Sequence, residues 1–386
     1  MRLTEHPFWL VGFRPFFTLA CLAGLSLPML WALIFSGSVA APSTTFSPTQ
    51  WHAHEMFFGF GWAVLGGFLL TSTKNWVNIR GYHGAALIFL AVAWLLERAG
   101  MWFEGALPAL LFQISNKLFL GSLVAMLVWT LVRHRQTDSY RDNAFFLVIL
   151  PLFLVAKHLM LSADLFQTGW SMALGLFRMA FLVMLERTLT PFMKSAFKVD
   201  ILRQPSLDMA IKLLALLLVF ERLMPALLAC AISLLLALLL AGRLVFWKPQ
   251  LALQRLDIGI MYLGYFALLA QLLIEAARPL APFVWVGTVS IHVFTFGVMG
   301  LIIPAMLIRI SNGHTGRKVN FDTRDKLVLW IMIVAFICRI IAPQIDPAGY
   351  LRWIHLAATG WLAAFTLLAW RYIPYLLSAR IDGKVH

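Results

Sequence analysis

The sequence predicts an all-α integral membrane protein, a single bundle of about twelve transmembrane helices with both termini in the cytoplasm. The 386-residue chain is 61% hydrophobic and only 12% charged, with a mean hydropathy of +0.84. A water-soluble fold could not cover such a composition with polar surface. Apolar runs of about twenty residues recur along the whole chain, each long enough to cross a hydrocarbon core roughly 30 Å thick. Strand-type alternation is absent, so the spans are expected to be helices.

Polar breaks between the apolar runs define the expected spans. In order, they are 15–37, 48–73, 82–99, 107–132, 143–162, 168–190, 207–220, 223–243, 258–275, 282–308, 325–343 and 348–371. The seventh and eighth are separated only by the break "FERLMP", and without it the count falls to eleven and the carboxyl end changes side. No cleavable signal, low-complexity stretch or convincing internal repeat is evident, so residues 1–386 are expected to form one polytopic domain.

The distribution of charge predicts the orientation. With the amino end inside, cytoplasmic segments would hold most of the 31 Lys and Arg residues, and the outer side only Arg98, Arg222, Arg278 and Arg352. The positive-inside rule therefore favours this topology and accounts for the net charge of +14. No basic run is interleaved with aromatic residues on a solvated face, so we expect no nucleic-acid partner. The partner at the apolar faces is the lipid bilayer.

Histidines lie inside several of these spans. The second span begins "SPTQWHAHEM", where Ser47 is expected to cap the helix and Gln50 to complete a capping box. At 1.5 Å per residue, His52 and His54 would lie roughly 8–10 Å from the outer end of the helix. The same arithmetic from Pro282 places His292 about 15 Å along the tenth span. His355 would lie about 12 Å along the twelfth, and His158 near the outer end of the fifth.

These histidines are candidate metal ligands, because neutral imidazole is a common ligand of haem iron and copper. His52 and His54 are about 200° apart around the helix axis, so they would serve two different sites. Glu55, one turn after His52, could orient that ring, relay protons or pair with a buried cation. The alternative for each histidine, above all His158 and His355, is a hydrogen bond between helices.

Other polar residues in the spans have alternative roles. Arg178 and Arg339 could hold haem propionates with bidentate hydrogen bonds, or could form interhelical ion pairs, for example with Glu186 or Glu97. Lys117 or Lys157 could belong to a proton path. The three cysteines lie within spans without metal-type spacing and are expected to be core residues.

Three segments resemble signature segments of a known family. "GFRPFF" at 12–17, "WHAHEMFFGFGWAVLGGFLLTSTKNW" at 51–76 and "HVFTFGVMGLIIPAMLIRISNGHTGR" at 292–317 are similar, in order and spacing, to those of the NnrS family of bacterial membrane proteins. The resemblance implies an inner-membrane protein of about twelve helices that carries haem and copper and protects cells against nitric oxide and nitrosative stress. It maps the histidine motif of the family onto His52 and His54, and its tenth-helix histidine onto His292.

Two classes of function follow. The first is a redox protein that binds nitric oxide in the outer half of the membrane, or converts it there as an oxidoreductase. His54 and His292 would ligate haem or copper, His52 would serve a second centre, and Glu55 would tune a ligand or deliver protons. Electrons would come from quinol or an electron-donor protein, because no redox domain is fused to the chain. The second class is a twelve-span transporter of a metal, haem or a small anion, with the buried charges as its substrate sites.

Overall fold

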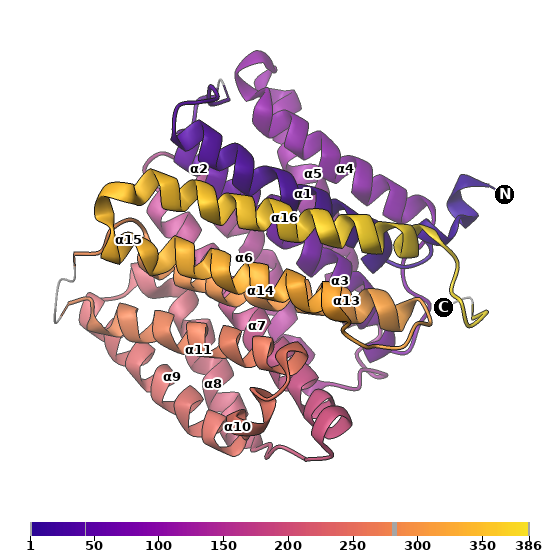
Figure 1. The fold of residues 1–386 in the computed structure, drawn as a ribbon. Coiled ribbons are helices and arrows are strands. Elements are labelled where there is room, and N and C mark those ends of the chain that lie inside the picture. Colours follow the sequence, from indigo (N-terminus) through magenta and orange to yellow (C-terminus); the bar gives the residue numbers. More distant parts are fainter. Residues whose placement is uncertain (1, 43, 280–283, 385–386) are drawn as a thin grey trace. The chain divides into compact units, whose positions relative to one another are not determined.

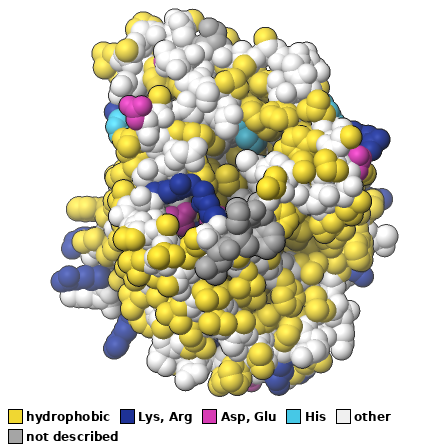
Figure 2. Space-filling model, turned by 90° about the vertical axis from the view of Figure 1, so that its left-hand side faces the viewer, with side chains coloured by type: hydrophobic (Ala, Val, Ile, Leu, Met, Phe, Trp, Pro, Cys, Tyr) yellow, Lys and Arg dark blue, Asp and Glu magenta, His cyan; other side chains and the backbone are white. Residues whose placement is uncertain are grey.

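The fold is all-helical. The computed structural model describes residues 2–42, 44–279 and 284–384, in which no strand occurs. Within these residues eleven helical segments are long and apolar enough to cross a membrane, so the chain is a multi-pass membrane protein. Figure 2 shows one face on which hydrophobic side chains predominate and charged ones form a few separate groups. Exposed residues such as Leu110, Leu238 and Trp330 belong to such apolar faces, which suit lipid.

The chain divides by packing into two compact units. Unit 1 comprises Met1–Gly169, Leu307–Asn320 and Trp361–His386, and unit 2 comprises Trp170–Met306 and Phe321–Gly360. This division is based on packing alone, so the expectation that residues 1–386 form a single membrane domain stays a prediction.

Unit 1 is built mainly from the first five spans and the start of α7. They are α1 (Phe13–Phe35), the continuous segment of α2 (Pro48–His54), η3 (Glu55–Gly61) and α3 (Trp62–Trp76), then α4 (Ala85–Trp102), α5 (Ala109–Arg133) and α6 (Ala144–Leu161). Helices α4 and α5 lie side by side, and α1 packs on α3 and η3 (Figure 1). The apolar faces that meet in these pairs form the core around α2 and η3.

Unit 2 contains most of the remaining helices. They are α7 (Phe166–Phe197), α8 (Pro205–Leu217), η6 (Leu218–Leu223), α9 (Ala226–Phe246), α10 (Pro249–Ala252), α11 (Leu256–Ala277), α12 (Val289–His292), η7 (Val293–Gly300), α14 (Thr323–Ile340) and α15 (Ala342–Ile345). Helix α11 lies beside α9 (Figure 1). It also packs on η7. Helices α13 (Leu301–His314) and α16 (Tyr350–Leu377) begin in unit 2 and end in unit 1.

All twelve expected spans have a helical counterpart, and the break at "FERLMP" is confirmed. Helix α8 ends at Leu217, η6 follows, and Met224 is extended before α9 begins. Within unit 1, Nη1 of Arg14 at the start of α1 donates to the carbonyl oxygens of Leu376 (2.8 Å) and Ser378 (2.6 Å) at the end of α16. The first span therefore begins on the same side of the membrane on which the last span ends. A chain whose first span starts and last span ends on one side crosses the membrane an even number of times. This favours twelve spans over eleven, and the cytoplasmic placement of that end stays a prediction.

The two segments that bear the candidate histidines share an unusual geometry. Helix α2 ends at His54 and continues as the π-helix η3, and α12 ends at His292 and continues as the π-helix η7. In both, a phenylalanine follows the histidine by four residues and a glycine by five, namely Phe58 and Gly59 in the first and Phe296 and Gly297 in the second. This short repeat was missed because "EMF" and "VFT" share no residue at matching positions. π-Helical turns are rare and concentrate at functional sites.

Candidate functional site: a buried cluster of ionisable residues

The start of the second span is fixed by a capping box. The Ser47 hydroxyl accepts from the backbone N–H of Gln50 (3.2 Å), and Oε1 of Gln50 accepts from the N–H of Ser47 (2.8 Å), as the sequence predicts. The side-chain amide of Gln50 also donates to the carbonyl oxygens of Met160 and Ser162 at the end of α6. These contacts hold the helix start in place and so position His52 and His54 one turn later.

Replacing Ser47 with alanine is expected to destabilise the protein by about 1 kcal/mol, because it removes an N-cap acceptor from the helix that carries the candidate histidines. The measurement is the thermal unfolding midpoint in mild detergent. Ser26→Ala is the matched control, since its exposed hydroxyl donates only within its own helix, to Leu22. Equal midpoints for the two variants would contradict a role for the cap.

His52 and His54 face different surroundings, as their spacing predicts. The ring of His52 is half-buried and stacks on Trp31 of α1, with 4.3 Å between ring centroids and 6° between planes. The ring of His54 is fully buried and lies among polar side chains of α4, α5 and α6. The two imidazoles therefore belong to separate environments.

The polar surroundings of His54 form a cluster, which we call the His54 cluster. Its members are His54, Glu55, Glu97, Arg98, Asn116 and Lys157. All belong to unit 1, and apart from Arg98, which is 13% exposed, each side chain or residue is at most 7% exposed.

Both ring nitrogens of His54 have protein partners. Nε2 lies 3.2 Å from the amide nitrogen of Asn116, which donates to it, and 3.5 Å from Oε1 of Glu97. Nδ1 lies 3.3 Å from Oε1 of Glu55. With Nε2 as an acceptor, the proton of the neutral ring is on Nδ1 and faces Glu55.

Two cations balance the two carboxylates of the cluster. Arg98 lies 3.0 Å from Glu55 through Nε and 2.6 Å from Glu97 through Nη2. Lys157 lies 2.6 Å from Oε1 of Glu97 and also donates to the carbonyl oxygen of Asn116. Burying charges is costly unless each is paired, and here two positive charges meet two negative ones.

Gly59 of η3 makes room for this pairing. A Cβ at position 59 would lie 2.6 Å from Nη1 of Arg98, and the carbonyl oxygen of Gly59 accepts from the indole N–H of Trp94. Only a residue without a side chain lets α4 bring Arg98 this close to the π-helix. The histidine, the π-helix and the glycine thus form one local arrangement.

Part of this cluster was not predicted from the sequence. The expected third span ended at residue 99 with Arg98 in the outer segment, whereas α4 continues to Trp102 and Glu97 and Arg98 lie on a buried face. The adjacent acidic and basic pair inside "AWLLERAGMW" was the available signal. Glu55 was expected beside the ring of His52, but it contacts His54; its pairing with a buried cation is confirmed, and Lys157 does lie in the cluster.

In unit 2 the structure brings together His292 and Arg339. Nη2 of Arg339 lies 3.3 Å from each ring nitrogen of His292, and Nδ1 of His292 also lies 2.9 Å from Oγ1 and from the carbonyl oxygen of Thr288. The expected depth of His292 was wrong. Pro282 lies outside the described residues, and the helix begins at Val289, so His292 is only about 5 Å along it.

Arg178 is buried in unit 2, and its Nε and Nη1 atoms make no hydrogen bond within the described residues. Glu221 and Glu275 interact electrostatically with Arg178, and they accept hydrogen bonds from Ser171 and Ser290. Glu186 pairs instead with Arg203, Lys212 and Arg243.

His158 is exposed and His355 half-buried, and neither ring takes part in a hydrogen bond or ion pair within the described chain. Lys117, the other lysine considered for a proton path, is exposed and donates to Gln113.

The described residues contain no group of three or more His, Cys, Asp or Glu side chains placed to hold a metal ion. His54 does not fit as a ligand in this arrangement, because both of its ring nitrogens face protein partners. His292 also has partners at both ring nitrogens, Arg339 at each and Thr288 at Nδ1, so its Nε2 would be open to a metal only with the Arg339 side chain turned away from the ring. A guanidinium beside an imidazole is the pair of groups that binds the propionates and the iron of haem.

The fold and the site together define a class, a polytopic α-helical membrane protein with a buried, charge-balanced ionisable cluster. The NnrS family model, described as NnrS protein, matches residues 7–380. The chain therefore belongs to the NnrS family. A search of curated proteins found no match to this chain.

Proposed function

We propose that this protein acts in the bacterial inner membrane in the response to nitric oxide and nitrosative stress, and that the His54 cluster holds and moves the protons of that activity. Membership of the NnrS family supports the response to nitric oxide. The observation that carries the assignment of the site is that the only two π-helices in the described residues each follow one of the candidate histidines directly.

The His54 cluster has the parts of a short proton relay. Glu55 lies on one side of the His54 ring and Glu97 on the other, at 3.3 and 3.5 Å. When Nε2 takes up a proton from Glu97, the imidazolium that forms can release its Nδ1 proton to Glu55, since imidazole exchanges protons at both nitrogens. Asn116 keeps the ring in the orientation that this exchange needs, and Arg98 and Lys157 stabilise the carboxylates after they release protons.

Haem and copper are the proposed cofactors. His292 with Arg339 is the favoured haem site, His52 is the second candidate ligand, and Arg178 is a further candidate for propionate binding because two of its donors are unsatisfied. When bound, haem supplies an iron centre that takes up nitric oxide and changes its charge by one electron. We propose quinol or an electron-donor protein as the source of that electron, and an oxidoreductase activity if turnover occurs.

The test is the absorption spectrum of protein purified after expression with ample haem and copper, recorded oxidised, reduced and with nitric oxide. We expect a haem band that shifts with nitric oxide in the wild type, that is lost or altered in His292→Ala or His52→Ala, and that is retained in His54→Ala. A colourless, copper-free wild type would overturn the cofactor proposal. Loss of the band in His54→Ala alone would overturn the assignment of His54 to the relay.

Transport is a second candidate function, and one observation favours it. Transporter substrate sites are typically built at corresponding irregular segments of two membrane helices, and the π-helices η3 and η7 change the helix geometry directly after corresponding histidines without breaking either span. A stable colourless protein that moves a metal, haem or a small anion across vesicle membranes would support transport instead of the redox function.

A further inference from the structure

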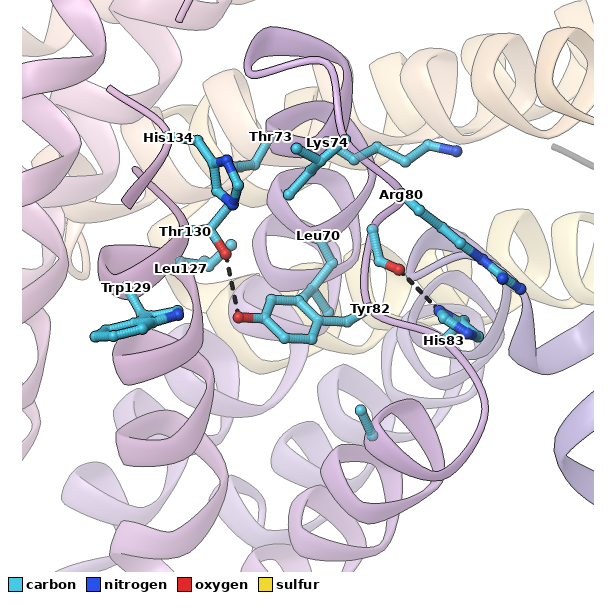
Figure 3. A pocket seen from close by; sticks show the side chains of 13 residues that line it. Leu70, Thr73, Lys74, Arg80, Tyr82, His83, Leu127, Trp129, Thr130 and His134 are labelled. Atoms are coloured by element: carbon cyan, nitrogen blue, oxygen red, sulfur yellow. Dashed lines mark hydrogen bonds between the residues drawn. The ribbon is translucent and has the colours of Figure 1, made fainter. Parts of the chain in front are cut away.

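A basic cavity of about 370 Å³ lies in unit 1, away from the His54 cluster. It is formed by the end of α3, the connection between α3 and α4, and the end of α5. Figure 3 shows Tyr82 at its centre, with His134 on one side and Arg80 and His83 on the other, while Lys74 extends along the rim toward the side of Arg80. The Tyr82 hydroxyl is held by Thr130 and by the carbonyl oxygen of Met126.

The charges of the lining point to an anionic ligand. Lys74, Arg80, His83 and His134 line the cavity, and no acidic residue does. The side chains of Lys74 and Arg80 make no hydrogen bond or ion pair within the described residues, so both keep their donors for a ligand. Lysine and arginine bind phosphate through charge-assisted hydrogen bonds. A phosphate group suits this cavity better than a neutral molecule.

The rest of the lining indicates that a lipid carries the phosphate. Leu70, Ile79 and Leu127 supply an apolar wall, and Trp129 is 67% exposed beside them. Tryptophan is enriched where membrane helices meet the headgroups, and basic pockets between helices on the cytoplasmic side bind anionic headgroups. The cavity lies at the ends of α3 and α5, the end of the spans that the charge distribution places in the cytoplasm.

We propose that this cavity binds the phosphate headgroup of an anionic phospholipid of the inner leaflet. Arg80 and Lys74 contact the phosphate oxygens, and His83 and His134 flank the headgroup. The acyl chains leave along Leu127 and Trp129 into the bilayer. Neither the His54 cluster nor a cofactor is needed for this binding, so its failure would leave the proposed function unaffected.

The test measures lipid binding to the detergent-purified full chain. The protein is titrated with cardiolipin, phosphatidylglycerol or phosphatidylcholine, and native mass spectrometry detects the bound lipid. We expect the wild type to bind the two anionic lipids at least tenfold more tightly than phosphatidylcholine. The double variant Lys74→Gln/Arg80→Gln should lose that preference. Arg133→Gln/Arg135→Gln is the matched control, because it removes the same charge from exposed residues at the end of α5 that do not line the cavity.

Two outcomes would overturn the proposal. Equal losses in the two double variants would show a general charge effect of this face. Displacement of the lipid by millimolar inorganic phosphate would assign the cavity to a soluble phosphate compound. If the double variant does not remain monodisperse, the single variant Arg80→Gln gives the same comparison, because Arg80 is exposed. We expect it to bind anionic lipids more weakly than Arg135→Gln does.

Discussion

Replacing Glu97 with glutamine is expected to destabilise the protein by about 3–5 kcal/mol, because breaking a buried ion pair from one side leaves charge uncompensated. Oxygen Oε1 of Glu97 lies 2.6 Å from both Arg98 and Lys157, and the side chain is fully buried. A neutral amide leaves two cations beside the single carboxylate of Glu55. The measurement is the midpoint of thermal unfolding in mild detergent, which should fall by many degrees.

A double variant separates lost charge balance from lost packing. Glu97→Gln combined with Lys157→Met removes one charge of each sign and should recover a large part of the stability, giving a coupling energy of about 1 kcal/mol or more. Asp200→Asn is the control at a surface pair, where both side chains are more than 60% exposed, and it should change little. Strictly additive losses for Glu97 and Lys157 would show that these residues do not act as a pair.

The helical architecture could be predicted from the sequence because an apolar run of about twenty residues can cross a membrane only as a helix. Each of the twelve expected spans has a helical counterpart, and the weakest boundary, at Glu221 and Arg222, is a true break. The capping box at Ser47 also follows from residue types and spacing alone. These predictions succeed because they depend on neighbours along the chain.

The site was harder to predict because it depends on neighbours in space. His52 and His54 were expected on opposite faces, but nothing in their own segment shows that α4 supplies Glu97 and Arg98, or that α6 supplies Lys157. The π-helical turns also have no established sequence code, and they change which residues share a face. Glu55 itself has α-helical dihedrals, and its carboxylate lies beside the adjacent His54 ring (3.3 Å), where Arg98 of α4 also pairs with it.

Replacing Gly297 with alanine is expected to destabilise the protein by about 1–3 kcal/mol through overpacking. A Cβ at this position of η7 would lie 2.7 Å from the Cβ of Ala267 in α11 and 2.8 Å from the ring of Phe336 in α14. The Ala267 Cβ is fixed to its backbone and cannot rotate away, so α11 and η7 would have to separate. His292, five residues earlier, would move with them and lose its position against Arg339.

The sign of the stability change on replacing a glycine with alanine distinguishes a closely packed glycine from one where only helix propensity matters. Gly242→Ala, at an exposed position of α9 with no atom within 4 Å of the added Cβ, should stabilise its helix by up to about 1 kcal/mol. Gly59→Ala should fall between the two, because the atom it meets is the movable end of Arg98, but it should weaken the pairing of Arg98 with Glu55. Thermal midpoints of the three variants test this order. If Gly297→Ala were as stable as Gly242→Ala, the close approach of η7 to α11 would not be required, and the correspondence between Gly59 and Gly297 would be one of sequence alone.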